Sequence, residues 1–153
     1  MYKRQVYDDI SSFGVFGEIN VDVNRNFNLG IKAEYFNYST DDEEEAWNLP
    51  DFEASLFMDY QINEHWFMGA NLYYIGERLD QRIIVNVLDP SPPSIVALES
   101  YFDANAHLGY RINDQWSVYA KANNIANQDY MRWVDYRVQG IQFLAGTTYK
   151  FDF

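Results

Sequence analysis

Apolar and polar residues alternate with a period of two in seven segments of the chain. This period is typical of β-strands, because successive side chains of a strand point to opposite faces of a sheet. The segments run over residues 13–23, 27–38, 52–61, 66–77, 101–111, 116–125 and 141–153. Most have ten or more residues, whereas strands of soluble proteins average about five or six and tilted membrane strands need about 9–11. The pattern predicts an all-β protein of about seven long strands, with the length that crosses a bilayer.

One face of each predicted strand carries no charge. In the segment 66–77, for example, Trp66, Met68, Ala70 and Leu72 share this face. The strand charges lie on the opposite faces, at Glu18, Asp22, Lys32, Glu34, Glu53, Asp59, Glu77, Asp103, Arg111, Lys121, Lys150 and Asp152. A Lys or Arg that faces lipid costs roughly 2–4 kcal/mol at mid-bilayer, so an uncharged face suits lipid. A soluble barrel with an apolar interior, however, alternates in the same way.

A short turn unit occurs twice, as YQINEHW at residues 60–66 and YRINDQW at residues 110–116, and VNRNF at residues 23–27 is a looser copy. Asn suits tight turns because it tolerates positive φ and its side chain bonds the nearby backbone. Aromatic residues stand on both sides of the two closer copies and on one side of the third, at Phe27, and they also end the last segment. Amphipathic rings settle where water meets an apolar medium, so we expect an aromatic belt at one membrane surface. The predicted belt residues are Phe27, Tyr60, Trp66, Tyr110, Trp116, Phe151 and Phe153.

The connections between the segments alternate in length. Short turns lie near residues 24–26, 62–65 and 112–115, and long loops lie near 39–51, 78–100 and 126–140. Barrels of the bacterial outer membrane have this rhythm, with short periplasmic turns and longer outer loops. The last segment ends on the side of the short turns, as a periplasmic C-terminus does. We therefore expect an antiparallel up-and-down meander that is part of a transmembrane β-barrel, in the cell outer membrane of a Gram-negative bacterium.

Composition narrows the range of functions. The 153 residues suffice for one domain, and the lack of Cys excludes disulfides and thiolate metal sites. The formal net charge of -12 argues against a nucleic-acid partner bound through its phosphates. No run of eighteen apolar residues predicts a membrane-spanning helix. The two His have no ligand spacing, and no catalytic triad, phosphate loop or zinc motif is present, so neither an enzyme nor a cofactor is expected.

The end of the chain, YAKANNIANQDYMRWVDYRVQGIQFLAGTTYKFDF at residues 119–153, resembles the C-terminal end of TonB-dependent outer-membrane receptors. In that family an Asn-rich segment leads to a loop with Tyr and Trp, and a Gly opens a last strand that ends in Tyr-Lys-Phe. The matching residues here are Asn123, Asn124, Ile125, Asn127, Tyr130, Trp133, Gly140, Tyr149, Lys150 and Phe151. The extra Asp152-Phe153 departs from the pattern but keeps a terminal aromatic in phase. Residues 13–38 also resemble hairpins of such barrels.

The resemblance implies a parent receptor with about twenty-two strands and an N-terminal plug, which imports a scarce nutrient such as an iron chelate, a vitamin or a glycan. Seven strands is an odd number, whereas single-chain bacterial barrels have even numbers. We therefore expect residues 13–153 to be a C-terminal barrel segment, preceded by a stub at 1–12. Residues 1–5, MYKRQ, resemble a translated sequencing adapter and are interpreted as a scar. The implied partners are outer-membrane lipid, the rest of the barrel and the plug, and the barrel-assembly machinery, which would act through the C-terminal strand.

The last predicted outer loop carries the candidate ligand contacts Tyr130, Trp133, Tyr136 and Arg137. Aromatic residues and Arg are enriched where ligands and partners dock, so a sugar or a chelate could stack there. The alternative is an upper aromatic belt combined with packing inside the loop. The sequence alone leaves both interpretations open.

Three further sets of residues also have two interpretations each. The acidic run at residues 41–45 suits a divalent cation that bridges lipopolysaccharide, or simply a solvated loop. The proline-rich residues 88–98 suit a lid, or a stiff surface excursion. Several polar-face residues could line a substrate path or contact the plug, or they could simply belong to the polar interior that such barrels have, with cross-strand pairing. The members of this third set are Glu34, Asp59, Asn71, Asn105, His107 and Lys121.

Two other architectures fit the alternation. In a small complete barrel of eight strands with a structural or adhesive role, residues 2–9 would add a strand and the first strand would pair with 141–153. In a soluble lipocalin-like binding barrel, the apolar faces would enclose a pocket. The receptor segment instead predicts a curved open sheet with two unpaired edges. Sheet closure and the direction of the apolar faces therefore separate the three hypotheses.

Overall fold

The computed structural model describes residues 9–41, 45–83 and 92–151. Within these ranges, no helix is long and apolar enough to span a bilayer. The strands are β1 (Ile10–Asn24), β2 (Phe27–Thr40), β3 (Phe52–Gln61), β4 (Trp66–Ile75), β5 (Arg78–Arg82), β6 (Ser94–Leu98), β7 (Tyr101–Arg111), β8 (Trp116–Asn123), β9 (Met131–Trp133), β10 (Tyr136–Arg137) and β11 (Gln142–Tyr149).

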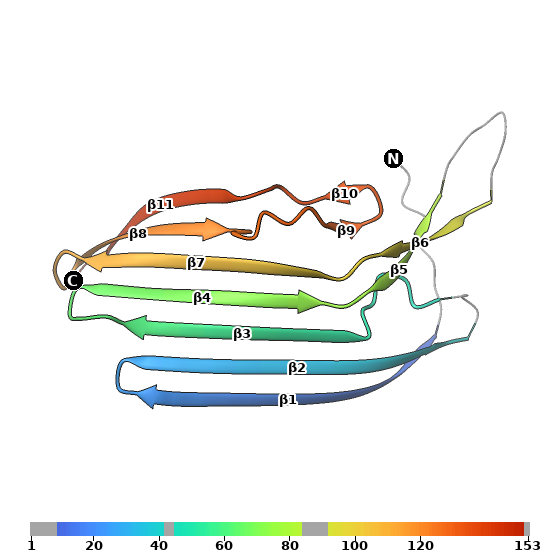
Figure 1. Cartoon of the computed structure of the whole chain (residues 1–153), viewed down its shortest axis with the longest axis horizontal. Coiled ribbons are helices and arrows are strands. Elements are labelled where there is room, and N and C mark those ends of the chain that lie inside the picture. Colours follow the sequence, from blue (N-terminus) through green and yellow to red (C-terminus); the bar gives the residue numbers. More distant parts are fainter. Residues whose placement is uncertain (1–8, 42–44, 84–91, 152–153) are drawn as a thin grey trace.

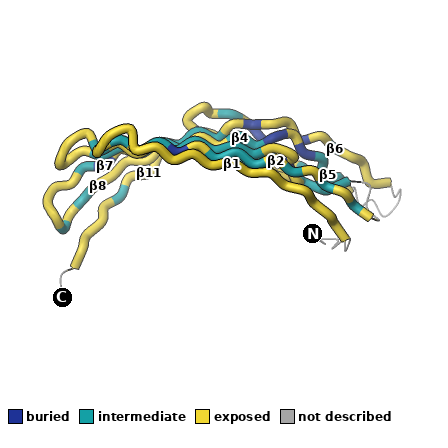
Figure 2. Tube along the Cα trace, turned by 90° about the horizontal axis from the view of Figure 1, so that it is seen from below, coloured by how far each residue is buried: buried dark blue, intermediate teal, exposed yellow. Residues whose placement is uncertain are grey.

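Seven long strands form one sheet in the order β1-β2-β3-β4-β7-β8-β11, and all neighbours are antiparallel. In the part of the chain that the structure describes, β1 pairs with β2 alone and β11 with β8 alone, so the sheet is open at both edges. Figure 1 shows the strands side by side, and Figure 2 shows them edge-on as one bowed layer. The predicted all-β meander is therefore confirmed, and the described residues do not close into the small complete barrel.

The pairing register joins the uncharged faces of the separate strands into one continuous surface. Residues directly opposite each other in a sheet lie on the same face. One row across all seven strands contains only apolar residues, namely Val21, Leu29, Met58, Ala70, Ala106, Ala122 and Phe143. The neighbouring row contains Asp22, Asn28, Asp59, Gly69, His107, Lys121 and Leu144. We call these two surfaces the apolar face and the polar face.

The sheet has almost no core of its own. Among the described residues, the buried apolar side chains are Leu98, Tyr101 and Tyr130, which belong to the long-loop end of the sheet. Large side chains of the apolar face are instead exposed, with Phe143 at 76% and Phe13 at 68%. Because the sheet is open in the described residues, this face does not enclose the pocket that a lipocalin-like barrel would require. Soluble monomers rarely expose apolar side chains that continue across a whole sheet face. This face needs lipid or another apolar surface to cover it.

The Asn residues of the short turns act through their side chains rather than through positive φ. Asn63 Oδ1 accepts hydrogen bonds from the backbone N–H groups of His65 and Trp66, both at 2.9 Å. Asn113 Oδ1 does the same for Gln115 at 3.0 Å and Trp116 at 2.8 Å. The predicted turns are thus present, but positive φ occurs elsewhere among the described non-glycine residues, at Asn48, Asn124, Asn127 and Asp135. Each repeat of the turn unit therefore folds as the same side-chain-capped turn.

Two predicted long loops contain short hairpins that the alternation did not indicate. Residues 78–100 include the β5–β6 hairpin, and residues 126–140 include the β9–β10 hairpin. These hairpins escaped prediction because their strands have two to five residues, too few to establish a period. Strand bounds also shift: β1 begins at Ile10 rather than at residue 13, and β4 ends at Ile75 rather than at residue 77.

Candidate functional site

A row of aromatic rings follows the short-turn end of the apolar face. Phe27 and Tyr60 pair edge-on, with 5.8 Å between ring centroids, and Trp66 lies 4.8 Å from Tyr110. Trp116 lies 6.1 Å from Tyr149, and Tyr149 lies 4.8 Å from Phe151. The pleat and the register thus bring the predicted belt residues together in cross-strand pairs, with Tyr149 as an added member. Phe153 lies outside the described residues.

A second aromatic row lies toward the long-loop end of the same face. Tyr74 contacts Phe52 at 5.9 Å and Phe102 at 4.8 Å, and Tyr35 is opposite Phe52 in the register. Four strands carry one ring in each row at a spacing of eight residues, as the pairs 27 and 35, 52 and 60, 66 and 74, and 102 and 110. Eight residues span about 27 Å along a strand, which is roughly 19–22 Å across a bilayer at the usual strand tilt of about 35–45° and fits within the apolar band of about 25 Å in outer-membrane barrels. This spacing was available in the sequence and would have predicted the second row.

Tyr130 is the centre of a small core at the long-loop end. Its ring stacks on Tyr101, with 3.8 Å between centroids and 7° between planes, and its hydroxyl donates to Asp103 Oδ2 at 3.0 Å. Only 7% of Tyr130 is exposed. Burial raises the pKa of the Tyr130 hydroxyl above its ordinary value, and the hydrogen bond to Asp103 and the charge of that carboxylate act in the same direction. Tyr130 therefore holds the last loop against the polar face of β7.

Arg78 ties the β5–β6 hairpin to the same core. Its guanidinium lies over the Tyr101 ring, 5.1 Å from the centroid, and its Nη2 donates to the carbonyl oxygen of Met131 at 2.9 Å. The residue is 6% exposed and faces Leu98 across the hairpin. A buried cation of this kind is stabilised by the ring quadrupole and by the charge-assisted hydrogen bond.

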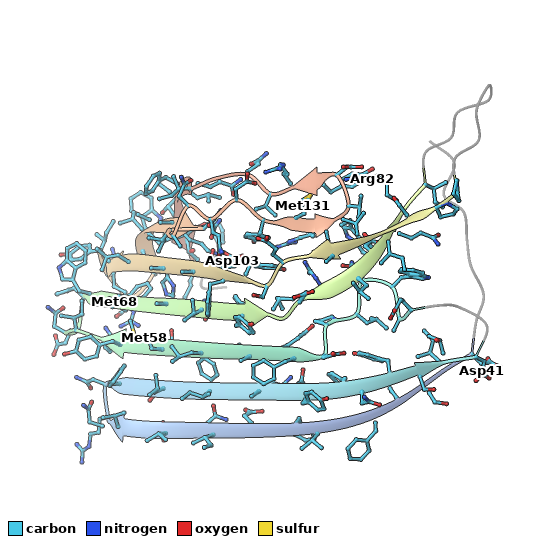
Figure 3. All side chains as sticks on the ribbon, turned by 45° about the vertical axis from the view of Figure 1, so that its right-hand side comes forward. Asp41, Met58, Met68, Arg82, Asp103 and Met131 are labelled. Atoms are coloured by element: carbon cyan, nitrogen blue, oxygen red, sulfur yellow. The ribbon has the colours of Figure 1, made fainter. Side chains whose placement is uncertain are left out.

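Further contacts join the outer loops to this hairpin. Asp80 Oδ2 accepts from the N–H of Val134 at 2.9 Å, and Arg82 forms a salt bridge with Asp135 at 2.8 Å. From the other side, the N–H of Asn48 donates to the carbonyl oxygen of Leu79 at 2.6 Å. Figure 3 shows Arg82 and Met131 at the same end of the sheet. The β5–β6 hairpin thus binds the loops on both of its sides into one layer.

The predicted ligand contacts therefore fall into two groups. Tyr130 is packed inside the loop layer, as the alternative interpretation of loop packing proposed. Trp133 and Tyr136 are opposite each other in the β9–β10 hairpin and are 57% and 53% exposed. Arg137 follows them and forms a salt bridge with Asp129 at an exposed position. The hairpin presents two aromatic rings and a paired guanidinium at the surface.

A polar cavity of about 480 Å³ lies beneath the last loop, on the polar face. Its floor includes Asp103 and Asn105 of β7, Asn123 of β8 and Gln142 of β11, and its roof includes Tyr130 and Arg137. Asp103 Oδ1 and Asn123 Oδ1 are buried and have no hydrogen-bond partner among the described residues. Of the polar-face candidates, only Asn105 lines this cavity. The sequence missed Asp103 and Asn123 as site residues, although both belong to the predicted polar faces.

Two other candidate sets are described only in part. Of the acidic run at residues 41–45, the structure describes Asp41 and Glu45, and 42–44 lie outside the described residues. Across 9–41, 45–83 and 92–151, no three His, Asp or Glu residues are placed to hold a metal ion. Of the proline-rich residues 88–98, those up to residue 91 lie outside the described part, and Ser94–Leu98 forms β6.

A bowed sheet with one uncharged face between two aromatic rows has the features of the wall of a transmembrane β-barrel. Comparison with known families is more specific: residues 4–125 match the family model described as TonB dependent receptor-like, beta-barrel. The chain therefore belongs to this family of receptor barrels. The match extends over the 13–38 segment, whereas most of the C-terminal segment that carried the resemblance lies beyond it.

Solved structures show the same fold. The ferripyoverdine receptor of the outer membrane of Pseudomonas aeruginosa is 14% identical, with a TM-score of 0.76 over 93% of this chain and 20% of that chain. The ferric-catecholate import receptor Fiu of E. coli K12 is 19% identical, with a TM-score of 0.72 over 95% and 22%. The siderophore receptor PiuA of Acinetobacter baumannii is 14% identical, with a TM-score of 0.70 over 94% and 22%. The chain thus spans about a fifth of the length of these receptors.

The family also gives the class of protein and its location in the cell. The protein is a barrel segment of a TonB-dependent receptor, and such receptors are located in the outer membrane of Gram-negative bacteria. They are transport proteins rather than enzymes, in agreement with the lack of catalytic motifs in the sequence. The open sheet matches a part of such a barrel.

Proposed function

We propose that this chain is part of the wall of a receptor that imports a ferric chelate. The solved receptors with the same fold support this cargo, since they are a ferripyoverdine receptor, a ferric-catecholate import receptor and a siderophore receptor. The observation in this chain that carries the proposal is the loop layer, which is tied together over a polar cavity at the long-loop end of the polar face. A ligand that arrives from outside meets this end of a barrel first.

Trp133, Tyr136 and Arg137 are the proposed ligand contacts, and Tyr130 supports them from within the loop layer. The two exposed rings offer apolar and stacking surface on a hairpin that the Arg82–Asp135 salt bridge and the Asp80–Val134 hydrogen bond attach to β5. A surface held in this way loses little conformational freedom when a ligand binds, and binding is correspondingly tighter.

The test is iron uptake by cells that carry the complete receptor. Deletion of its gene should abolish growth on one or more ferric chelates as the iron source, and Trp133→Ala with Tyr136→Ala should reduce uptake at least several-fold. Ile95→Ala, on the exposed part of β6, is the matched control and should leave uptake unchanged. The proposed cargo would be refuted if cells without the receptor grew on every ferric chelate and the receptor instead supported the uptake of a vitamin or a glycan.

We further propose that lipid covers the apolar face between the two aromatic rows, and that the assembly machinery of the outer membrane recognises β11. The supports are the exposure of Phe143 and the unpaired edge of β11 in the described residues. Tyr149→Ala with Phe151→Ala should lower the amount of folded receptor in the outer membrane. An unchanged amount would contradict the assembly role of this strand.

A further inference from the structure

The Asn-rich segment that follows β8 takes no part in the proposed ligand contacts, yet it turns the chain sharply into the last outer loop. Asn124 and Asn127 have positive φ angles of 47° and 48°. Asn adopts this left-handed region more readily than most other residues that have a side chain. Gly would turn the backbone at least as well, so the hydrogen bonds of the two Asn side chains decide whether these residues have a further role.

The side chain of Asn124 joins the two ends of the last loop. Its Nδ2 donates to the carbonyl oxygen of Gln128 at 3.0 Å and to that of Gln139 at 3.1 Å, and its Oδ1 accepts from the N–H of Gln128 at 3.0 Å. A carboxamide suits this position because it has both donors and an acceptor. Asn124 is only 5% exposed, so water competes little for these bonds. We call residues 124–128 and 139–141, which this side chain brings together, the neck of the last loop.

Asn127 closes the same neck at a more exposed place. Its Oδ1 accepts from the N–H of Ile141 at 3.0 Å, and its own N–H donates to the carbonyl oxygen of Asn124 at 2.8 Å. Gly140 leaves room for the Asn127 amide, because a Cβ at residue 140 would lie 2.7 Å from Asn127 Oδ1. Three residues of the C-terminal pattern, Asn124, Asn127 and Gly140, therefore meet in one structural unit.

The neck is also fastened to β7. The N–H of Asn124 donates to Asn105 Oδ1 at 3.3 Å, and Gln128 Oε1 accepts from the N–H of Phe102 at 2.8 Å. A loop whose ends are fixed to each other and to a strand has fewer conformations than a loop that is free at its base. The β9–β10 hairpin, which lies between the two sides of the neck, therefore loses less conformational entropy when a ligand binds.

We propose that Asn124 and Asn127 are positioning residues for the ligand: by closing the neck, they hold Trp133 and Tyr136 in the orientation that binds a ferric chelate. This inference rests on the proposed import of a ferric chelate and adds two residues that act through the loop. When the neck opens, only a fraction of the receptors presents the hairpin correctly. The apparent dissociation constant of the chelate rises in proportion as that fraction falls.

Glycine variants separate this role from the turning of the backbone. Asn124→Gly and, separately, Asn127→Gly keep access to positive φ but remove the side-chain hydrogen bonds. Asn48→Gly is the matched control, because Asn48 also has a positive φ, of 58°, and its Oδ1 has no hydrogen-bond partner among the described residues. The backbone hydrogen bond from Asn48 to Leu79 remains in this control. If the neck residues only turned the chain, all three variants would bind ligand as the unaltered receptor does.

Ligand binding to the complete, detergent-solubilised receptor is the first readout. The probes are the Fe(III) complexes of a tris-catecholate, of a tris-hydroxamate and of citrate, each labelled with radioactive iron. For every complex that the unaltered receptor binds, we expect Asn124→Gly to raise the dissociation constant at least about fivefold and Asn127→Gly, which loses one exposed hydrogen bond, about twofold. Asn48→Gly should leave the constant unchanged. Backbone hydrogen exchange should speed up at Gln128 in Asn124→Gly and at Ile141 in Asn127→Gly.

The constants are measured on folded receptor, identified by its heat-dependent mobility in gel electrophoresis. Asn127→Gly, the milder variant, keeps the test decisive if Asn124→Gly does not assemble. Unchanged constants in the neck variants, or equal weakening by Asn48→Gly, overturn this inference and leave the import of a ferric chelate standing. Binding of none of the three complexes by the unaltered receptor, together with receptor-independent growth on ferric chelates, overturns both proposals.

Discussion

At the scale of single residues, glycines on the polar face lie under aromatic rings of the neighbouring strand. The opposed pairs are Gly14 and Phe36, Gly30 and Phe57, Gly69 and His107, Gly109 and Phe67, and Gly146 and Tyr119. A Cβ added at Gly14 would lie 2.7 Å from Phe36 Cε1, and one at Gly109 would overlap the Phe67 ring. Each ring thus covers backbone that a glycine leaves bare, an arrangement that fixes cross-strand register.

Gly109→Val should expel the Phe67 ring and lower the free energy of unfolding by about 1–3 kcal/mol, the usual cost of overpacking. Gly17→Val is the control, because no atom lies within 4 Å of a Cβ at that position. Chemical denaturation of the complete receptor in detergent compares the two. Equal destabilisation would show that the ring contact is not the cause, and Phe67→Ala combined with Gly109→Val should recover part of the loss.

Tyr130→Phe should keep the stack on Tyr101 and remove the hydrogen bond to Asp103. Both oxygens of that carboxylate would then lack a partner, at a cost of about 1–3 kcal/mol. Hydrogen exchange of the backbone around residues 128–134 should speed up in the variant. Protection equal to that of the unaltered receptor would contradict the role assigned to the hydroxyl.

The same hydroxyl makes the loop layer sensitive to alkali. The pKa of Tyr130 is higher in the folded protein than its ordinary value of 10.0, so the protonated form favours the folded loop. This stabilisation is complete below pH 10.0 and is lost as the pH rises through the raised pKa. The pKa of Tyr38 is also raised, chiefly by burial, so ultraviolet titration should show more than one tyrosine that ionises late, and Tyr130→Phe should remove one of them.

At the scale of elements, the β5–β6 hairpin holds the loop layer through two unequal arginines. Arg78 is buried against Tyr101, whereas the Arg82–Asp135 salt bridge is exposed. We expect Arg78→Met to destabilise the layer by about 2–3 kcal/mol and Arg82→Met by less than about 1 kcal/mol, because water and salt screen exposed pairs. Limited proteolysis within residues 126–140 measures both effects. Equal susceptibility of the two variants would contradict this ranking.

At the scale of the whole molecule, the two faces of the sheet should tolerate charge differently. Leu72→Lys places a cation in the middle of the apolar face and should cost about 2–4 kcal/mol. Tyr73→Lys is its neighbour on the polar face, in the same row as Asp103, and should cost much less. The amount of folded receptor in the outer membrane reports the difference. Comparable loss in both variants would argue against lipid on the apolar face.

The distance between the sheet edges distinguishes a receptor wall from a small closed barrel. Neighbouring strands lie about 4.8 Å apart, so Asn20 on β1 and Gln142 on β11 are several strand widths apart in the wall. The test variant carries Asn20→Cys and Gln142→Cys. Because the chain has no Cys of its own, these are the only thiols that it contributes. We expect no cross-link with a short thiol reagent, whereas Asn71→Cys with Asn105→Cys, which are opposed in the register, should react readily.

The sequence by itself determined the seven long strands, their two faces, the short turns and the aromatic row beside them. These features depend on local chemistry, since a period of two fixes the face of each side chain and Asn63 and Asn113 cap their own turns. The tertiary structure alone decided the loop layer and the polar cavity. Tyr130 meets Asp103 across 27 residues, and Arg78 meets Met131 across 53, so their contacts exist only after strand order brings the loops together. No period or motif marks such partners, because their pairing depends on which strands become neighbours and not on the residues beside them in the chain.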